Sequence, residues 1–323
     1  KAQAASEAFD PSQANIDART RRLAFDGVKV ALLAKKNRGE SVNVSLRLNL
    51  GDEKSLFGQR TAAQFAGAML SRGTTKLSRT QIADEMERLK MAGSVGGTGA
   101  SFQTTGPNLE EAVRLAVHVL REPAFPAAEF EQLKAQNLTG LEAQRSVSNA
   151  RASEALRRHF NPWPKGDWRY APTLDESIEA AKAVTLEDAK RFHREFYGAH
   201  AAEIAIVGDF DEAKAAALVK SLLAGWKGER GYARVPAAQR KAPAETITIE
   251  TPDKENAILL ARQAIDLRDD DADYPALFVA NYILGGDAGL DSRLGKRLRQ
   301  QEGLSYGAGS GLSVPSIDRT GEW

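Results

Sequence analysis

The strict alternation of aliphatic and polar residues over positions 41–50 strongly constrains the fold. The aliphatic positions are Val42, Val44, Leu46, Leu48 and Leu50, and every position between them is polar. Such a period of two indicates a half-buried strand, with one face on a core and the other in water. The preceding segment, 23–33, is strand-like around Gly27. We therefore predict that segments 23–33 and 42–50 form an antiparallel pair.

Helices follow these strands. Residues 60–70 read RTAAQFAGAML and are small or apolar almost all round, which predicts a tightly packed helix. Two further helix starts carry a capping signature, in which Ser78 precedes Gln81 by three residues and Thr185 precedes Asp188 by three.

Glycine and turn residues divide the rest of the first half. The Gly-rich segment 94–107 predicts a hairpin, and Asn108 predicts the N-cap of the next helix. A mostly helical stretch runs over 127–160, followed by a Pro- and Trp-bearing loop. Residues 203–207 predict a short buried strand, and residues 211–226 an amphipathic helix.

The order of elements then starts again. A basic, Gly/Pro-punctuated segment at 227–243 is typical of a linker. Beyond it we predict strands at 246–250 and 257–261 and a helix beginning near Tyr274, which is a weak echo of the opening order.

These patterns predict an α+β fold with two homologous domains, each a mainly antiparallel sheet with helices on one face. We expect a polar linker at 1–20, a first domain at 21–226, a linker at 227–243 and the start of a second domain at 244–323. The polar opening and the missing closing element lead us to expect a piece of a longer polypeptide with a truncated second domain.

Charge and composition exclude several classes of function. The 44 Lys and Arg residues nearly cancel the 43 Asp and Glu residues, so no global field attracts nucleic acid or an anionic membrane. The absence of cysteine excludes disulfides, thiolate nucleophiles and Cys-ligated zinc. No apolar run reaches the roughly 18 residues of a membrane span. Compartment is left open, because a cysteine-free chain suits cytosol or periplasm.

The histidines do not suggest a metal site. They are His118, His159, His193 and His200, and no two stand three or four residues apart, so no helical turn offers two imidazoles to one metal. His193 and His200 have Glu195 between them but straddle the helix stop at Gly198, which favours ordinary solvated or hydrogen-bonded side chains. No nucleophile elbow, phosphate-binding loop or dinucleotide fingerprint follows a strand.

One constellation, at 292–306, carries donors suited to catalysis. The pattern predicts a helix that stops at Gly303 and a strand entered through Leu304 and Tyr306. Arg299 in the last helical turn and Tyr306 seven residues later both carry donors for a carbonyl oxygen or an oxyanion. Taken alone, the pattern equally suits an arginine serving the helix dipole and a packed tyrosine.

Several short phrases, in this order, resemble the pitrilysin, insulinase and mitochondrial processing peptidase superfamily, the inverted zincins. They are FDGV at 25–28, GD at 51–52, RGT at 72–74, PAF at 123–125, AIVGD at 205–209 and the segment 292–306. Active members carry His-x-x-Glu-His on the first helix, where two histidines bind zinc and the glutamate acts as base, and a later glutamate is the third ligand.

The resemblance implies that this chain has lost that site. Gln64 stands in place of the first His, Gly67 of the Glu and Ala68 of the second His. The third-ligand region falls at 138–141, with Thr139 and Gly140 where acidic residues belong. Glu142 is two residues out of frame. No cofactor is expected in this chain.

The same resemblance gives Arg299 and Tyr306 a role, since the superfamily uses an Arg and a Tyr at this spacing to contact the substrate carbonyl and the developing oxyanion. We therefore expect the non-catalytic half of a two-part zinc metalloendopeptidase, which binds extended peptide. A partner half, fused or separate, would supply the zinc.

Two alternatives stay open: a structural or assembly subunit without a proteolytic role, and a free-standing peptide-binding module. The resemblance gives periplasm as the expected compartment, while substrate sequence and oligomeric state are invisible in the sequence.

Overall fold

The structure is a computed structural model that describes residues 6–286 and 291–323. The chain forms two compact units. Unit 1 consists of Lys1–Leu138 and Glu179–Arg234, and unit 2 of Thr139–Ile178 and Val235–Trp323. The domain boundaries predicted from the sequence remain a prediction.

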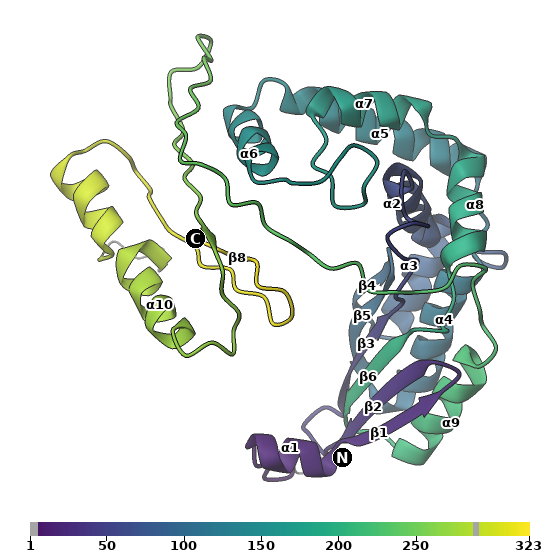
Figure 1. Cartoon of the computed structure of the whole chain (residues 1–323). Helices are drawn as coiled ribbons and strands as arrows, with labels where there is room; N and C mark the ends of the chain where they lie inside the picture. Colours follow the sequence, from purple (N-terminus) through teal and green to yellow (C-terminus); the bar gives the residue numbers. More distant parts are fainter. Residues whose placement is uncertain (1–5, 287–290) are drawn as a thin grey trace. The chain divides into compact units, whose positions relative to one another are not determined.

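A six-stranded sheet organises unit 1 (Figure 1). Its strands are β1 (Arg21–Phe25), β2 (Val28–Ala34), β3 (Ser41–Arg47), β4 (Ala92–Gly96), β5 (Gly99–Thr105) and β6 (Glu203–Gly208). Their spatial order is β1-β2-β6-β3-β5-β4, and every neighbouring pair is antiparallel except β2 with β6. The predicted α+β class with a mainly antiparallel sheet is confirmed.

The predicted pairing of segments 23–33 and 42–50 is wrong. Segment 23–33 is itself a hairpin, with its turn at Asp26 and Gly27, where φ is 47° and 83°. Strand β6 then lies between β2 and β3, parallel to one and antiparallel to the other. Its buried Ile204 and Ile206 continue the apolar face of both neighbours. Local periodicity carries no information about a partner so far along the chain.

The two faces of the sheet differ. Helices α4 (Leu109–Arg121) and α9 (Glu212–Leu223) cover one face, where the alternating aliphatic side chains of β3 are buried (Figure 1). On the other face the register aligns a row of small side chains across five strands: Ala31, Ala205, Ser45, Ser101 and Ser94. The serines of this row are exposed.

The shorter helices of unit 1 are α1 (Gln13–Arg19), α2 (Arg60–Met69), η1 (Leu70–Arg72), α3 (Arg79–Arg88), η2 (Gly106–Asn108) and α8 (Leu186–Phe196). Helix α1 lies inside the segment expected to be a polar linker. The capping boxes predicted at Ser78 and Thr185 are present. Asn108 is the N-cap residue of α4, as predicted, but its side chain makes no capping hydrogen bond and donates instead to the Leu89 carbonyl, 3.2 Å away.

Helices dominate the remainder of the chain. Helices α5 (Ala127–Gln144) and α7 (Leu174–Ala183) each run from one unit into the other. Unit 2 adds α6 (Ser148–His159), α10 (Tyr274–Asn281), the π-helical turns η3 (Tyr282–Gly286) and η4 (Gly295–Gln301), and the short strands β7 (Ala264–Ile265) and β8 (Gly321–Glu322). No helix among the described residues is long and apolar enough to cross a membrane.

The strands predicted at 246–250 and 257–261 are wrong. Both segments are mostly exposed and neither belongs to a strand. A strand exists through the hydrogen bonds of a neighbouring strand, and the described part of unit 2 forms only the two-residue β7–β8 ladder.

Candidate functional site

Helix α2 carries the positions at which the resemblance places a zinc motif. Gln64 and Ala68 are exposed, one turn apart on the same face of the helix, whereas Gly67 is buried between them. On the buried side, the Phe65 ring lies 5.5 Å from the Phe130 ring. The helix is thus anchored on one side and presents an amide and a methyl group on the other.

The turn of the β4–β5 hairpin closes against Gly67. The Gly97 N–H donates to the Gly67 carbonyl over 3.1 Å, and the Tyr197 hydroxyl donates to the Gly97 carbonyl. A Cβ atom added to Gly67 would lie 2.9 Å from the Gly97 Cα, closer than real Cβ atoms come. Tyr197 is 3% exposed, and burial raises its pKa. Backbone and a buried phenol therefore fill the space beside position 67.

Zinc does not fit the residues at these positions. An amide, a hydrogen atom and a methyl group replace the two imidazoles and the carboxylate, and zinc in proteins takes imidazole, thiolate or carboxylate ligands. Glu142 of α5, near the third-ligand position, forms an ion pair at 2.5 Å with Arg145, which directly follows the helix. Within 6–286 and 291–323, no group of three His, Cys, Asp or Glu could hold a metal ion.

Three of the histidines make local contacts within unit 1. His118 Nε2 lies 2.9 Å from the Thr74 hydroxyl, and His200 Nδ1 accepts from the Gly228 N–H at 3.4 Å. His193 Nε2 lies 2.9 Å from the Leu120 carbonyl, and burial lowers the pKa of His193. The Glu195 carboxylate pairs with Arg230 at 3.0 Å. These contacts agree with the structural interpretation of the histidines.

The structure brings Arg299 and Tyr306 together in unit 2. Gly303 ends η4 with φ of 64°, and the Leu304 N–H donates back to the Leu298 carbonyl over 2.8 Å. This reversal places the Arg299 guanidinium over the Tyr306 ring, 4.4 Å from its centroid. The strand predicted at Leu304 and Tyr306 is wrong, because the reversal leaves them without a neighbouring strand.

The two donors differ in exposure: Tyr306 is 86% exposed, and Arg299 is half-buried. Among the described residues, no carboxylate forms an ion pair with Arg299, whereas Arg297 on the same turn pairs with Glu302 at 2.6 Å. A guanidinium stacked on a phenol offers N–H and O–H donors to one acceptor, such as a carbonyl oxygen.

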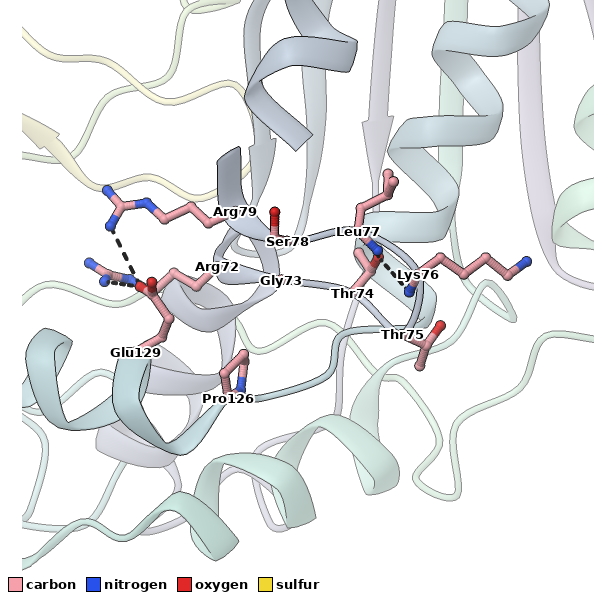
Figure 2. Close-up of a pocket in the computed structure, with 10 residues that line it drawn as sticks. All are labelled: Arg72, Gly73, Thr74, Thr75, Lys76, Leu77, Ser78, Arg79, Pro126 and Glu129. Atoms are coloured by element: carbon pink, nitrogen blue, oxygen red, sulfur yellow. Dashed lines mark hydrogen bonds and ion pairs between the residues drawn. The ribbon is translucent and has the colours of Figure 1, made fainter. Parts of the chain in front are cut away.

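Unit 1 also contains a pocket of about 420 Å³ next to the end of α2 (Figure 2). The loop at 72–79 and the start of α5 line it. Arg72 and Arg79 both reach the Glu129 carboxylate, at 2.9 and 3.5 Å. Figure 2 shows these three side chains together and Lys76 pointing away from them. The two arginines that line the pocket thus neutralise this carboxylate, and the cluster fastens η1 and the start of α3 to α5.

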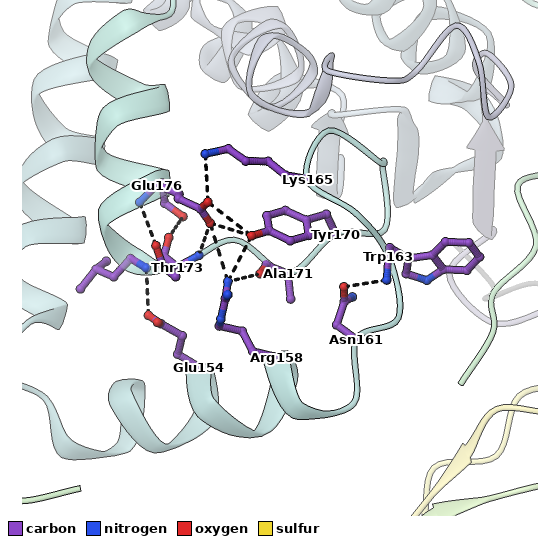
Figure 3. A network of polar contacts seen from close by, with 11 residues as sticks. Glu154, Arg158, Asn161, Trp163, Lys165, Tyr170, Ala171, Thr173 and Glu176 are labelled. Carbon is purple, nitrogen blue, oxygen red and sulfur yellow. Dashed lines mark hydrogen bonds and ion pairs between the residues drawn. The ribbon is translucent and has the colours of Figure 1, made fainter. Parts of the chain in front are cut away.

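A polar network holds the loop between α6 and α7 (Figure 3). Glu176 is its centre, with Lys165 at 2.9 Å, the Tyr170 hydroxyl at 3.0 Å and Arg158 at 3.7 Å. The Thr173 N–H also donates to Glu176, and this bond together with Lys165 lowers the pKa of the carboxyl to about 2. The network makes the loop part of unit 2, and it carries no group left over for chemistry.

The contact of Tyr197 with the β4–β5 turn was missed by sequence reasoning. The sequence pattern assigns Gly97 only to a hairpin and Tyr197 to no role. The available signal was Gly67 itself, because a glycine inside a helix costs about 1 kcal/mol relative to alanine and so points to a close approach.

Comparisons with known proteins agree with the resemblance. Residues 183–320 match the family described as the peptidase M16 inactive domain. The structure of a peptidase M16 inactive domain from Pseudomonas fluorescens is similar with a TM-score of 0.75 and 26% identity, covering 94% of this chain and 72% of that chain. No curated protein matches the chain.

Two more distant structures share the fold. A protease from Helicobacter pylori has a TM-score of 0.72 at 17% identity, covering 94% of this chain and 73% of that chain. A conserved protein from Enterococcus faecalis has a TM-score of 0.64 at 19% identity, with coverages of 94% and 74%. The family match over residues 183–320, the 26% identical structure and the replaced motif on α2 together support an inactive, peptidase-like half of the pitrilysin superfamily.

Proposed function

We propose that this chain is the non-catalytic half of a two-part zinc metalloendopeptidase. It binds extended peptide and presents Arg299 and Tyr306 to the scissile carbonyl. A partner half, on the same polypeptide or a separate subunit, supplies the zinc.

The Arg299–Tyr306 pair carries this proposal. If Arg299 and Tyr306 had no function, we would expect them to pair with neighbouring groups or to be replaced by other residues. Arg299 instead stacks on an 86% exposed tyrosine at 4.4 Å. Oxyanion-hole donors accelerate acyl transfer because they are already oriented where negative charge develops. A stacked pair supplies such orientation, since each side chain restricts the rotamers of the other.

The test is turnover of an unstructured peptide by the chain combined with its zinc-bearing half. Arg299→Ala should lower kcat by a factor corresponding to about 2–4 kcal/mol, the range for oxyanion-hole donors. Zinc content of the complex should not change, because no ligand of the metal is altered. Arg299→Lys should recover only part of the rate, because an ammonium group lacks the planar fork of donors.

Arg297→Ala is the matched control, because Arg297 lies on the same turn and pairs with Glu302. It should leave kcat within about twofold, as is usual for an exposed ion pair. Unchanged turnover in Arg299→Ala, with activity still dependent on the presence of this chain, would assign the chain instead to the structural or assembly class.

A further inference from the structure

One long segment of the chain, residues 224–263, forms neither helix nor strand (Figure 1). Loops of more than about 12–15 residues without secondary structure are uncommon in compact domains, and most are functional or linkers. Hydrogen bonds fasten this segment at points. The Ala237 N–H donates to the Asp318 carboxylate at 2.8 Å, and the Gln239 side chain donates to the Gly321 carbonyl. The stretches between such points are mostly exposed.

Two adjacent basic residues, Arg240 and Lys241, follow the second of these points. Both are exposed, and neither pairs with a carboxylate among the described residues. The Ala242 N–H donates to the Arg240 carbonyl over 3.0 Å, which forms a three-residue turn with Lys241 at its centre. Positions 235–244 contain no acidic residue. The pair therefore offers two cationic side chains at a turn, without a local carboxylate to compete for them.

Such a pair fits one class of partner, an endopeptidase whose specificity pocket carries a carboxylate. The pocket binds the basic side chain, and the enzyme hydrolyses the amide bond that follows it. Exposed loop tips are also where proteolytic cuts concentrate. We propose that the chain is cut at Arg240–Lys241, after one residue or the other, and that the cut chain stays assembled as a two-chain form. Each cut consumes one water and leaves a new carboxylate and a new ammonium group.

Other basic residues of the segment are matched by neighbouring carboxylates. Arg230 pairs with Glu195 at 3.0 Å, and Lys254 pairs with Asp253 at 3.2 Å. A protease pocket would have to compete with these carboxylates for the cation. Cleavage at either position is therefore slower than at the Arg240–Lys241 pair.

The bond that follows Lys227 is protected by packing. A Cβ atom added to Gly198 would lie 2.2 Å from the Gly228 nitrogen and 2.9 Å from the Lys227 carbonyl carbon, so the chain passes this bond at close range. The Ala199 N–H also donates to the Trp226 carbonyl over 2.8 Å. A protease can reach this bond only after local unfolding.

Contacts on both sides of the pair hold the cut chain together. The site falls inside unit 2, whose parts precede and follow it in the sequence. Arg151 donates to the Glu250 carbonyl over 3.2 Å, and the Arg262 guanidinium lies 4.9 Å from the centroid of the Phe160 ring. The bonds made by the Ala237 N–H and the Gln239 side chain also join the two pieces. None of these contacts involves the hydrolysed bond.

Limited digestion of the full chain with trypsin, whose specificity pocket is acidic, tests the site. Intact-mass measurements over time in native buffer should first show 1–240 with 241–323, or 1–241 with 242–323. Proteolysis of a folded chain follows the population of its locally opened form, and opening that breaks a hydrogen bond to a charged group lowers that population about tenfold. First cuts at any other position would overturn the proposal.

Replacing both residues, as Arg240→Gln with Lys241→Gln, gives the decisive variant. Loss of the full-length chain should slow by about tenfold, because the remaining sites need local opening. Lys254→Gln is the matched control, since it also removes one basic residue from the segment; it should change the rate by less than about twofold. Equal rates for the double variant and the unmodified chain would contradict the assignment.

Size-exclusion chromatography of the cut chain tests the second part of the proposal. The two fragments should elute together in native buffer and apart in urea. Arg151→Ala removes one of the bonds that join them, so it should lower the urea concentration at which they separate. Separation of the unmodified fragments in native buffer would show that the cut chain does not stay assembled.

Discussion

The two regions that the resemblance singles out, the motif positions on α2 and the Arg299–Tyr306 pair, differ sharply in their surroundings. On α2, the ligand positions hold Gln64, Gly67 and Ala68, and the β4–β5 turn lies against Gly67. In unit 2, half-buried Arg299 stacks on Tyr306, which is 86% exposed. The first region serves packing, whereas Tyr306 stays open to solvent. Because the β4–β5 turn fills the space beside Gly67, restoring the zinc-motif side chains on α2 would not by itself restore a metal site. The Arg299–Tyr306 pair meets no such obstruction.

Two tyrosines make this contrast measurable. Tyr197 is 3% exposed and donates to the Gly97 carbonyl beside the replaced motif, while Tyr306 is 86% exposed and stacks under Arg299. If the comparison holds, changes around Tyr197 should alter stability, and changes at Tyr306 should alter only the activity of the assembled enzyme.

The largest effect is expected for Gly67→Glu, which restores the catalytic glutamate of the superfamily. The new Cβ would lie 2.9 Å from Gly97 Cα, and the carboxylate would enter a buried site. Overpacking together with a desolvated charge should lower the free energy of unfolding by roughly 3 kcal/mol or more. Urea denaturation would measure it.

Ala68→Glu is the matched control, because position 68 is exposed on the same helix. It should change the free energy of unfolding by no more than about 0.5 kcal/mol. Equal stability of the two variants would show that the β4–β5 turn does not close the site.

A smaller loss is expected for Tyr197→Phe. The substitution keeps the ring but removes the hydroxyl that donates to the Gly97 carbonyl, so this hydrogen bond is lost. The cost should be about 0.5–1.5 kcal/mol, measured as a shift of the urea midpoint without a change of slope. A midpoint equal to that of the unmodified chain would mean that water replaces the lost donor and that the region is open.

The dependence of stability on alkaline pH also tests whether the Tyr197 hydroxyl is buried. Burial raises the pKa of Tyr197, so the folded chain keeps this proton at pH values where the unfolded chain, with an ordinary tyrosine, releases it. Stability conferred by the protonated phenol is therefore present below about pH 10 and is lost above it, by at most about 1.4 kcal/mol per pH unit. Tyr197→Phe should remove this part of the slope, as seen in urea midpoints taken across the alkaline range.

Much of this contrast could be predicted from the sequence, for identifiable reasons. The lost ligands, the capping boxes at Ser78 and Thr185 and the stop at Gly303 depend on residue type and short spacing, which the sequence states directly. The insertion of β6 between β2 and β3 could not be predicted, because it depends on a partner far along the chain.

The contact of the β4–β5 turn with Gly67 on α2 could not be predicted from the sequence either, because it too joins distant parts of the chain. Gly97 and Tyr197 are one hundred residues apart, and neither has a local pattern that points to the other. The strand expected at Leu304 and Tyr306 failed differently, because the chain reverses at Gly303 and no neighbour among the described residues completes a ladder. Periodicity reports which side chains are apolar; the partner of a strand is decided by tertiary structure.

The smallest effect on stability is expected for Tyr306→Phe. The ring that stacks under Arg299 is kept, and the hydroxyl is exposed, so the free energy of unfolding should change by less than about 0.5 kcal/mol. In the complex with the zinc-bearing half, kcat should nevertheless fall, since an oxyanion donor is lost. Assaying stability and turnover on one preparation separates the two readouts. A fall in both would make Tyr306 a packing residue like Tyr197, and the contrast between the two regions would disappear.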